Sequence, residues 1–161
     1  VKDGELDFTD LKHIELDDRE VRKLELREGD LLINRTNSKE LVGKAAVFHE
    51  PIKCVFASYL IRMRLVPEVV DSDFVVAIVN GPIGRQQVDA MSRQILGQAN
   101  INSEELRSLL IPLPPLPVQR ALVERVSGAR AEIARERAEA DRLAAAIAAE
   151  TEALLLGQPR S

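Results

Sequence analysis

Hydrophobic residues recur at heptad spacing through the last quarter of the chain. The residues at the two seam positions are Leu122, Val126, Ile133, Ala140, Leu143, Ile147 and Leu154. Pro117 suits a first helical turn, and Gly157 and Pro159 are typical of a helix end. Good helix formers (Ala, Glu, Arg and Leu) fill most of the interval. The pattern therefore predicts one helix over residues 118–156.

Such a helix is about 55–60 Å long at ~1.5 Å per residue, much longer than a globular domain of this size is wide. We therefore expect a second helix to cover its apolar stripe, as in a coiled coil. A helix that folds back on its own domain is the alternative. Charged residues beside the stripe, such as Arg135 and Glu139, are typical of a solvated face.

Short apolar runs between turn residues predict strands and short helices upstream. Asp17 and Asp18 are typical of an N-cap and predict a helix to about Leu24. The apolar runs at 31–33, 45–48, 53–57 and 58–65 predict strands, and residues 34–40 predict a polar loop.

Residues 67–117 predict helices more than strands. Asp71 to Asp73 predict the start of a helix through Val79, which residues 80–82 interrupt before a second helix over 83–91. We expect a loop over 97–102, a short helix capped by Ser103, and a last strand over 109–111. The proline-rich residues 113–117 predict a stiff linker.

These elements define an α+β (mixed α/β) globular domain followed by a long C-terminal coiled-coil helix. The expected boundaries are 1–112 for the domain, 113–117 for the linker, 118–156 for the helix and 157–161 for a tail. The first residue is Val1, not Met, which predicts a chain that starts inside a longer protein.

The net charge of −4 and the pI near 5.3 argue against a free-standing nucleic-acid binder that acts through bulk charge. Charge is uneven, however: residues 31–64 hold six basic and two acidic side chains between acidic flanks. This distribution still permits a localised basic face. The single cysteine, Cys54, is typical of a small buried residue. With no secretory or membrane-length apolar segment, it predicts a cytoplasmic protein.

No motif for catalysis is evident. Gly81 and Gly84 have the wrong spacing for a dinucleotide fingerprint, and the two histidines, His13 and His49, are isolated. No Cys/His set has zinc spacing. We therefore expect a non-catalytic protein without a metal.

Two stretches carry side chains of the kinds that contact DNA. Residues 34–44 supply Arg35, Thr36, Asn37, Ser38, Lys39 and Lys44, which suit base edges and phosphates. A polar turn between strands is the alternative. Arg85, Gln86 and Gln87 suit a helix that enters a groove, or equally a solvated helix face.

Two longer motifs favour DNA contact over the polar-turn and solvated-face alternatives. The stretch LREGDLLINRTNSKELVGK, residues 26–44, resembles the central motif of the target recognition domain in specificity subunits of type I restriction–modification systems. Residues 98–102, Leu106, residues 111–116 and Gln119 resemble that family's boundary between domain and long helix. The resemblance covers about residues 20–156.

The resemblance implies a domain that reads one half of a split double-stranded DNA target and a helix that pairs with a second helix. It implies docking to a modification (methyltransferase) subunit, which binds S-adenosylmethionine, and indirect association with the restriction subunit. The specificity subunit itself has no catalysis. Gln98 and Asn100 are further candidates for DNA contact, or for fixing their loop through backbone hydrogen bonds.

Two departures from the family pattern are visible. Val118 stands where the family usually has Glu before the Gln, and the domain is N-terminally incomplete. The chain is therefore expected to be a fragment, or a half-subunit that pairs with itself as a homodimer. Two competing functions stay open: a coiled-coil scaffold that binds protein and not DNA, and the excised recognition region of a fused type II restriction enzyme.

Overall fold

The computed structural model describes residues 1, 4–95 and 98–156, and for residues 93–95 and 98 it describes the backbone alone. The chain divides into two compact units, Val1–Val123 and Glu124–Ser161. The expected tail, residues 157–161, lies outside the described residues, as do the predicted helix-ending residues Gly157 and Pro159.

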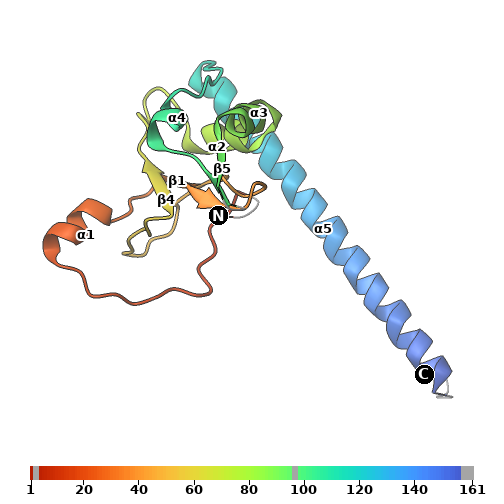
Figure 1. The fold of residues 1–161 in the computed structure, drawn as a ribbon. Helices are drawn as coiled ribbons and strands as arrows, with labels where there is room; N and C mark the ends of the chain where they lie inside the picture. Colours follow the sequence, from red (N-terminus) through yellow and green to blue (C-terminus); the bar gives the residue numbers. More distant parts are fainter. Residues whose placement is uncertain (2–3, 96–97, 157–161) are drawn as a thin grey trace. The chain divides into compact units, whose positions relative to one another are not determined.

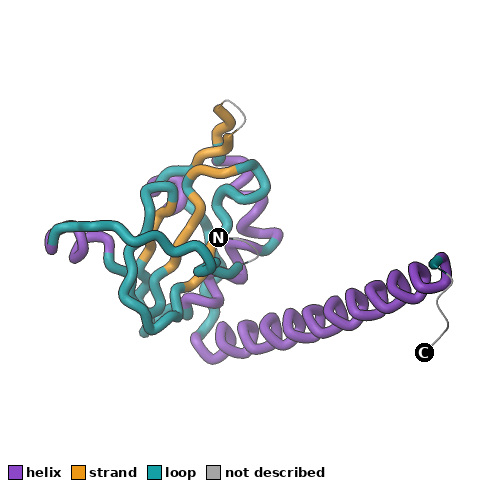
Figure 2. The backbone as a smooth tube through the Cα atoms, turned by 90° about the horizontal axis from the view of Figure 1, so that it is seen from below, coloured by secondary structure: helices purple, strands orange, loops and turns teal. Residues whose placement is uncertain are grey.

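The first unit combines short helices with two small sheets (Figures 1 and 2). Its elements are α1 (Asp18–Leu24), β1 (Leu31–Asn34), β2 (Thr36–Asn37), β3 (Ala45–Val47), β4 (Leu60–Met63), α2 (Ser72–Asn80), α3 (Pro82–Met91), β5 (Arg93–Ile95), β6 (Gln98–Asn100), α4 (Ser103–Arg107) and the start of α5 (Leu116–Leu155). Both sheets are antiparallel, with strand orders β3-β1-β4 and β2-β6-β5. The predicted fold class, an α+β domain followed by a long helix, is confirmed.

Strand β1 is the centre of the domain because both of its faces are buried. Leu31 and Ile33 enter the main core, which α2, α3 and α4 complete. Leu32 enters a second cluster with Leu26 and Phe48 on the opposite face. A strand covered on both sides needs no alternation of polar and apolar residues. The continuous run Leu31-Leu32-Ile33 therefore forms a strand without a solvent face.

Helix α2 closes the free edge of this sheet with a side chain. The Asn80 amide nitrogen donates to the Ala45 carbonyl at 2.7 Å, and the Asn80 carbonyl accepts from the Ala45 N–H at 2.9 Å. The amide thus takes the place of a neighbouring strand and satisfies backbone groups that an edge strand would leave unpaired.

Several predicted elements were wrong. Residues 97–102 were expected as a loop, but Gln98–Asn100 pair with Thr36–Asn37 and with Arg93–Ile95. Residues 109–111 form no strand. The run 53–57 contributes one isolated bridge, between Val55 and Glu25. Asn102, and not Ser103, caps α4 by accepting from the backbone N–H groups of Glu104 and Glu105.

The beginning of α5 is fixed to the domain by one buried amide. The Gln119 side chain accepts from the Asp71 backbone N–H at 2.9 Å and donates to the carbonyls of Pro114 at 2.7 Å and Val69 at 3.2 Å. Its exposed fraction is 0%. One side chain therefore joins the proline-rich segment, the residues before α2 and the first turns of α5.

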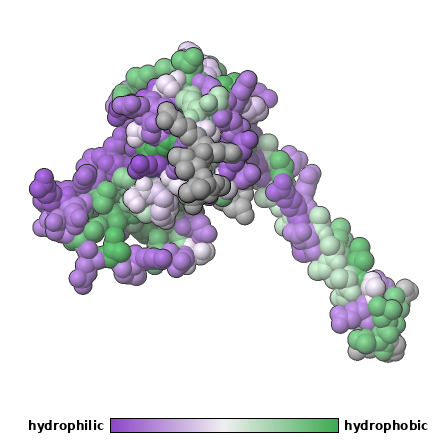
Figure 3. All heavy atoms as spheres, in the orientation of Figure 1, coloured by the Kyte–Doolittle hydropathy of each residue, from purple (hydrophilic) through white to green (hydrophobic). Residues whose placement is uncertain are grey.

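The second unit is the rest of α5, one uninterrupted helix to Leu155 (Figure 1). Hydrophobic and hydrophilic side chains alternate along its surface (Figure 3). Predicted seam residues are exposed: Ile133 by 48%, Leu143 by 56% and Ile147 by 66%. Leu122, Ala140 and Leu154 are exposed as well, and Val126 is half-buried. No helix within the described ranges combines the length and apolar character that crossing a membrane needs.

Replacing Gln119 with leucine tests the buried amide. Gln119→Leu keeps the volume but leaves one N–H and two carbonyls without their partner, so the free energy of unfolding should fall by about 2–3 kcal/mol. Urea denaturation followed by circular dichroism measures this. Arg120→Ala, at the exposed next position, is the control and should have a much smaller effect. Equal stability of Gln119→Leu and the wild type would show that the amide contributes nothing.

Candidate nucleic-acid interface

The polar loop 35–44 leaves the buried end of β1 at Asn34. The Asn34 backbone closes the loop: its N–H donates to the Lys44 carbonyl at 3.0 Å, and its carbonyl accepts from the Gly43 N–H at 2.8 Å. Its side-chain amide donates to the Leu41 carbonyl at 2.9 Å. With an exposed fraction of 1%, Asn34 supports the loop from inside and is not one of its exposed groups.

The returning half of the loop is a tight turn packed on α3. The Ser38 carbonyl accepts from the N–H groups of Leu41 and Val42. Gly43 has a φ of +70°, and a Cβ there would lie 2.5 Å from Cγ1 of Val88. Both the backbone conformation and the close approach of α3 therefore require glycine at this position.

The outgoing half presents exposed polar side chains. Arg35, Ser38 and Lys39 are exposed, and Thr36, Asn37 and Lys44 are half-buried. Within its described residues, the structure gives the side chains of Arg35 and Lys44 no ion pair. Hydrogen bonds from its own backbone and from the Ser38 hydroxyl lower the pKa of Glu40. The loop therefore offers cations and amides together with one ionised carboxylate.

Strand pairing brings two separately predicted candidates together. Thr36 lies opposite Asn100 in the β2–β6 ladder, and its hydroxyl donates to the Asn100 side-chain carbonyl at 2.6 Å. This bond orients the Asn100 amide. The neighbouring Ala99 belongs to the core, so Thr36 and Asn100 lie on the face of the sheet away from it. The side chain of Gln98 lies outside the described residues.

The candidates on α3 behave differently. Arg85 is half-buried, donates to the Val42 carbonyl at 2.7 Å and pairs with Asp89 at 3.0 Å. Gln87 exchanges two hydrogen bonds with the Leu110 backbone, at 2.9 and 3.0 Å. Both side chains therefore serve contacts within the domain, and the groove-entering interpretation gains no support from them. Gln86 is exposed.

One residue next to the loop was not among the sequence candidates. Tyr59 is 59% exposed, and its carbonyl accepts from the Arg35 N–H at 2.9 Å. The only sequence signal is an aromatic residue in a predicted strand, which normally indicates core. Its place beside Arg35 follows from the pairing of β1 with β4, which single-sequence patterns do not specify.

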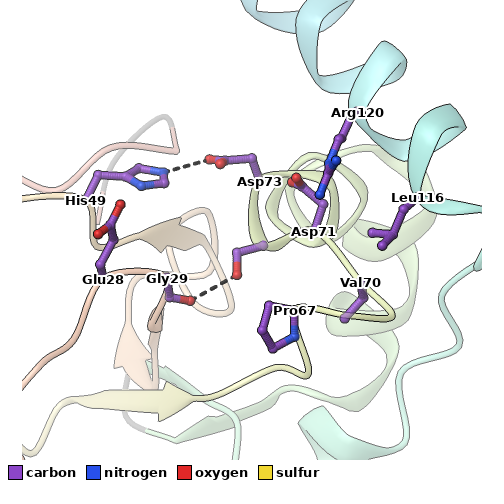
Figure 4. Close-up of a pocket in the computed structure, with 10 residues that line it drawn as sticks. Glu28, Gly29, His49, Pro67, Val70, Asp71, Asp73, Leu116 and Arg120 are labelled. Carbon is purple, nitrogen blue, oxygen red and sulfur yellow. Dashed lines mark hydrogen bonds and ion pairs between the residues drawn. The ribbon is translucent and has the colours of Figure 1, made fainter.

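The pocket in Figure 4 lies at the N-terminus of α2 and does not suggest catalysis. Its lining includes Glu28, His49, Asp71, Asp73 and Arg120. His49 Nε2 lies 3.1 Å from Asp73 Oδ1, and the Asp71 carboxylate caps α2 through the Phe74 N–H. Among the described residues, no group of three or more His, Cys, Asp or Glu side chains is placed to hold a metal ion.

Comparison with known proteins gives several matches of one kind. The chain is 31% identical over 127 residues to the StySPI specificity subunit of Salmonella potsdam, a type I restriction enzyme subunit, covering 78% of this chain and 27% of that protein. It is 28% identical over 131 residues to the EcoKI specificity subunit of Escherichia coli K12, covering 78% and 28%. The MjaX specificity subunit of Methanocaldococcus jannaschii matches at 25% over 129 residues, covering 79% and 30%. No protein-family model matches the chain.

The predicted resemblance to type I specificity subunits is therefore confirmed. Curated members of that class, from bacteria and from Methanocaldococcus jannaschii, match this chain over about 78% of its length at 25–31% identity. The chain spans less than a third of the length of these relatives.

Removing the Arg85 side chain tests its role in supporting the loop. Arg85→Ala deletes the bonds to Val42 and Asp89, so hydrogen exchange at residues 41–43 should accelerate and stability should fall by about 1–2 kcal/mol. Exchange followed by mass spectrometry measures the first effect. Gln86→Ala, one position along the same helix, is the matched control. Unchanged exchange in Arg85→Ala would mean that the loop does not depend on this contact.

Proposed function

We propose that this chain is a sequence-specific DNA recognition module of a type I restriction–modification enzyme and reads one half-site of a split target. The observation that carries the proposal is the loop 35–44. It places Arg35, Ser38 and Lys39 on the surface while Asn34, Val42 and Gly43 fix it from inside. Preorganised polar side chains on a rigid base are what direct readout of base edges requires.

The neighbouring sheet adds to this surface. A two-stranded β-ribbon fits the major groove of B-DNA, and an oriented Asn amide suits adenine, which needs one donor and one acceptor. Thr36 and Asn100 supply such an amide on β2 and β6. Arg35, Lys39 and Lys44 favour contact with phosphates, although the whole chain is acidic. The other basic residues of 31–64, Lys53, Arg62 and Arg64, form ion pairs with Glu25 or Asp30.

The long helix serves assembly in this proposal. Its exposed stripe, represented by Ile133, Leu143 and Ile147, pairs with a second helix and docks the modification subunit. The methyltransferase chemistry and its S-adenosylmethionine belong to that partner, and the restriction subunit joins through it. The chain itself is a non-catalytic subunit.

The decisive experiment is selection from a random duplex pool at about 150 mM salt, with and without a cognate modification subunit. Enrichment of a short asymmetric motif, or of two copies at fixed spacing, supports the proposal. No enrichment in either arm, from a folded protein that binds the modification subunit, favours the scaffold alternative. The length of the parent chain distinguishes a type I specificity subunit from a fused type II restriction enzyme whose recognition region has been excised.

Arg35→Ala tests base reading directly. If the guanidinium contacts a guanine through two hydrogen bonds, the variant should lose about 1–3 kcal/mol of binding free energy and accept other bases at one position. Repeating the selection with the variant measures both effects. Lys39→Ala is the comparison and should weaken all sequences equally. A uniform loss with Arg35→Ala would assign Arg35 to phosphate instead.

Ile133→Asp tests the helix stripe. A carboxylate at a buried seam position has no partner, so self-association or docking of the modification subunit should be lost. Ultracentrifugation and co-purification measure these. Ala134→Asp carries the same charge one position off the stripe and should leave both unchanged. Equal association of the two variants would show that the apolar stripe does not form the interface. That result is expected for a helix that folds back on its own domain.

A further inference from the structure

Tyr59 is unusual among the aromatic residues of this chain. It is the only tyrosine, and the chain has no tryptophan. Phe48 and Phe74 are buried, and Phe8 and Phe56 are half-buried, whereas Tyr59 is 59% exposed. No hydrogen bond to its hydroxyl is found within the described part of the chain. The domain therefore presents one aromatic ring and one phenol to solvent.

A backbone hydrogen bond places Tyr59 next to Arg35. The β1–β4 ladder ends with Asn34 opposite Leu60, and the bond from the Arg35 N–H to the Tyr59 carbonyl, at 2.9 Å, continues it by one position. Arg35 lies at a bend and Tyr59 in a turn just beyond the paired strands, so this hydrogen bond brings their backbones together. Both residues are exposed. The principal candidate for base reading thus has an aromatic neighbour.

The chemistry of the phenol favours phosphate over a base. Arg presents two parallel donors that match guanine, but a single hydroxyl cannot distinguish base pairs in this way. Tyrosine hydroxyls do donate to phosphate oxygens, and such contacts fix the register of a protein on the duplex without reading sequence. Arg35, whose side chain has no ion pair among the described residues, adds a positive charge that suits an anionic backbone.

We propose that the Tyr59 hydroxyl donates to a DNA phosphate oxygen next to the base pair that Arg35 contacts. Tyr59 is thereby a positioning residue: it sets where the guanidinium meets the groove. This inference rests on the proposed function and adds a residue and a contact type to it.

Tyr59→Phe is the first test, because it removes the hydroxyl and keeps the ring. Affinity for the duplex enriched by the wild type should fall roughly 10-fold, the usual size of a lost hydrogen bond to a charged group. The enriched sequence itself should stay the same. Ser58→Ala removes a neighbouring exposed hydroxyl and should change neither property.

A phosphate scan separates contact from a merely structural effect. Neutral methylphosphonates are placed one at a time along the enriched duplex. At one position the wild type should lose the same roughly 10-fold, while Tyr59→Phe should lose nothing further. In parallel, 3-fluorotyrosine in this chain gives a single ¹⁹F resonance, because Tyr59 is the only tyrosine. That resonance should shift with the enriched duplex and not with the unlabelled modification subunit alone.

The outcomes distinguish this inference from the proposed function. If the wild type selects a sequence but Tyr59→Phe binds it equally well, only the inference is overturned. The same holds if every methylphosphonate that weakens binding of the wild type weakens binding of Tyr59→Phe by the same factor. A ¹⁹F shift caused by the modification subunit and not by DNA would assign Tyr59 to a protein interface. If the wild type selects no sequence, both fall together.

Discussion

The burial of β1 on both faces is the constraint on which the rest of the domain depends. Leu31 and Ile33 belong to one hydrophobic cluster and Leu32 to another, so a single strand joins two cores. Neither side can be exposed without loss of apolar burial. Because the strand cannot shift its register without reversing both faces, the residue at which it ends is also fixed. That residue is Asn34, and the polar loop starts immediately after it.

Hydrogen bonds from buried and half-buried amide side chains fix the segments around this core. The Asn34 amide supports the loop, the Asn80 amide covers an edge strand, and the Gln119 amide joins three segments. Directional hydrogen bonds of this kind define positions more exactly than apolar contact does, since they are expensive to leave unmade. Half-buried Arg85 adds a further contact by donating from α3 to the Val42 carbonyl. The candidate interface is therefore built on satisfied groups, and its exposed side chains stay available.

Sequence patterns predicted the elements whose residues are strongly periodic or continuously apolar. The heptad series gave the long helix almost to the residue, and the apolar run at 31–33 gave β1. The small sheet was missed because β2 and β6 are only two and three residues long and mostly polar, and their pairing is not visible in local sequence patterns. The same reason applies to the candidate site. Local composition found the exposed loop, but it could not separate Arg35 from Arg85, whose side chain is occupied by contacts distant in sequence. Nor could it place Tyr59 beside Arg35.

The bonds of Gln119 have a consequence for how α5 can vary. The partners of the Gln119 side chain are backbone groups of Val69, Asp71 and Pro114, all of which precede α5 in the chain. These bonds therefore fix the position at which the helix begins. Each residue inserted or deleted further along would change the helix length by about 1.5 Å and would rotate the following residues by about 100° about the helix axis. The position where the helix begins would stay the same. A four- or seven-residue insertion would nearly preserve the direction of the apolar stripe, whereas two residues would turn it to the opposite side. The length of the helix and the direction of its apolar stripe would thus change in discrete steps, independently of the residues in loop 35–44.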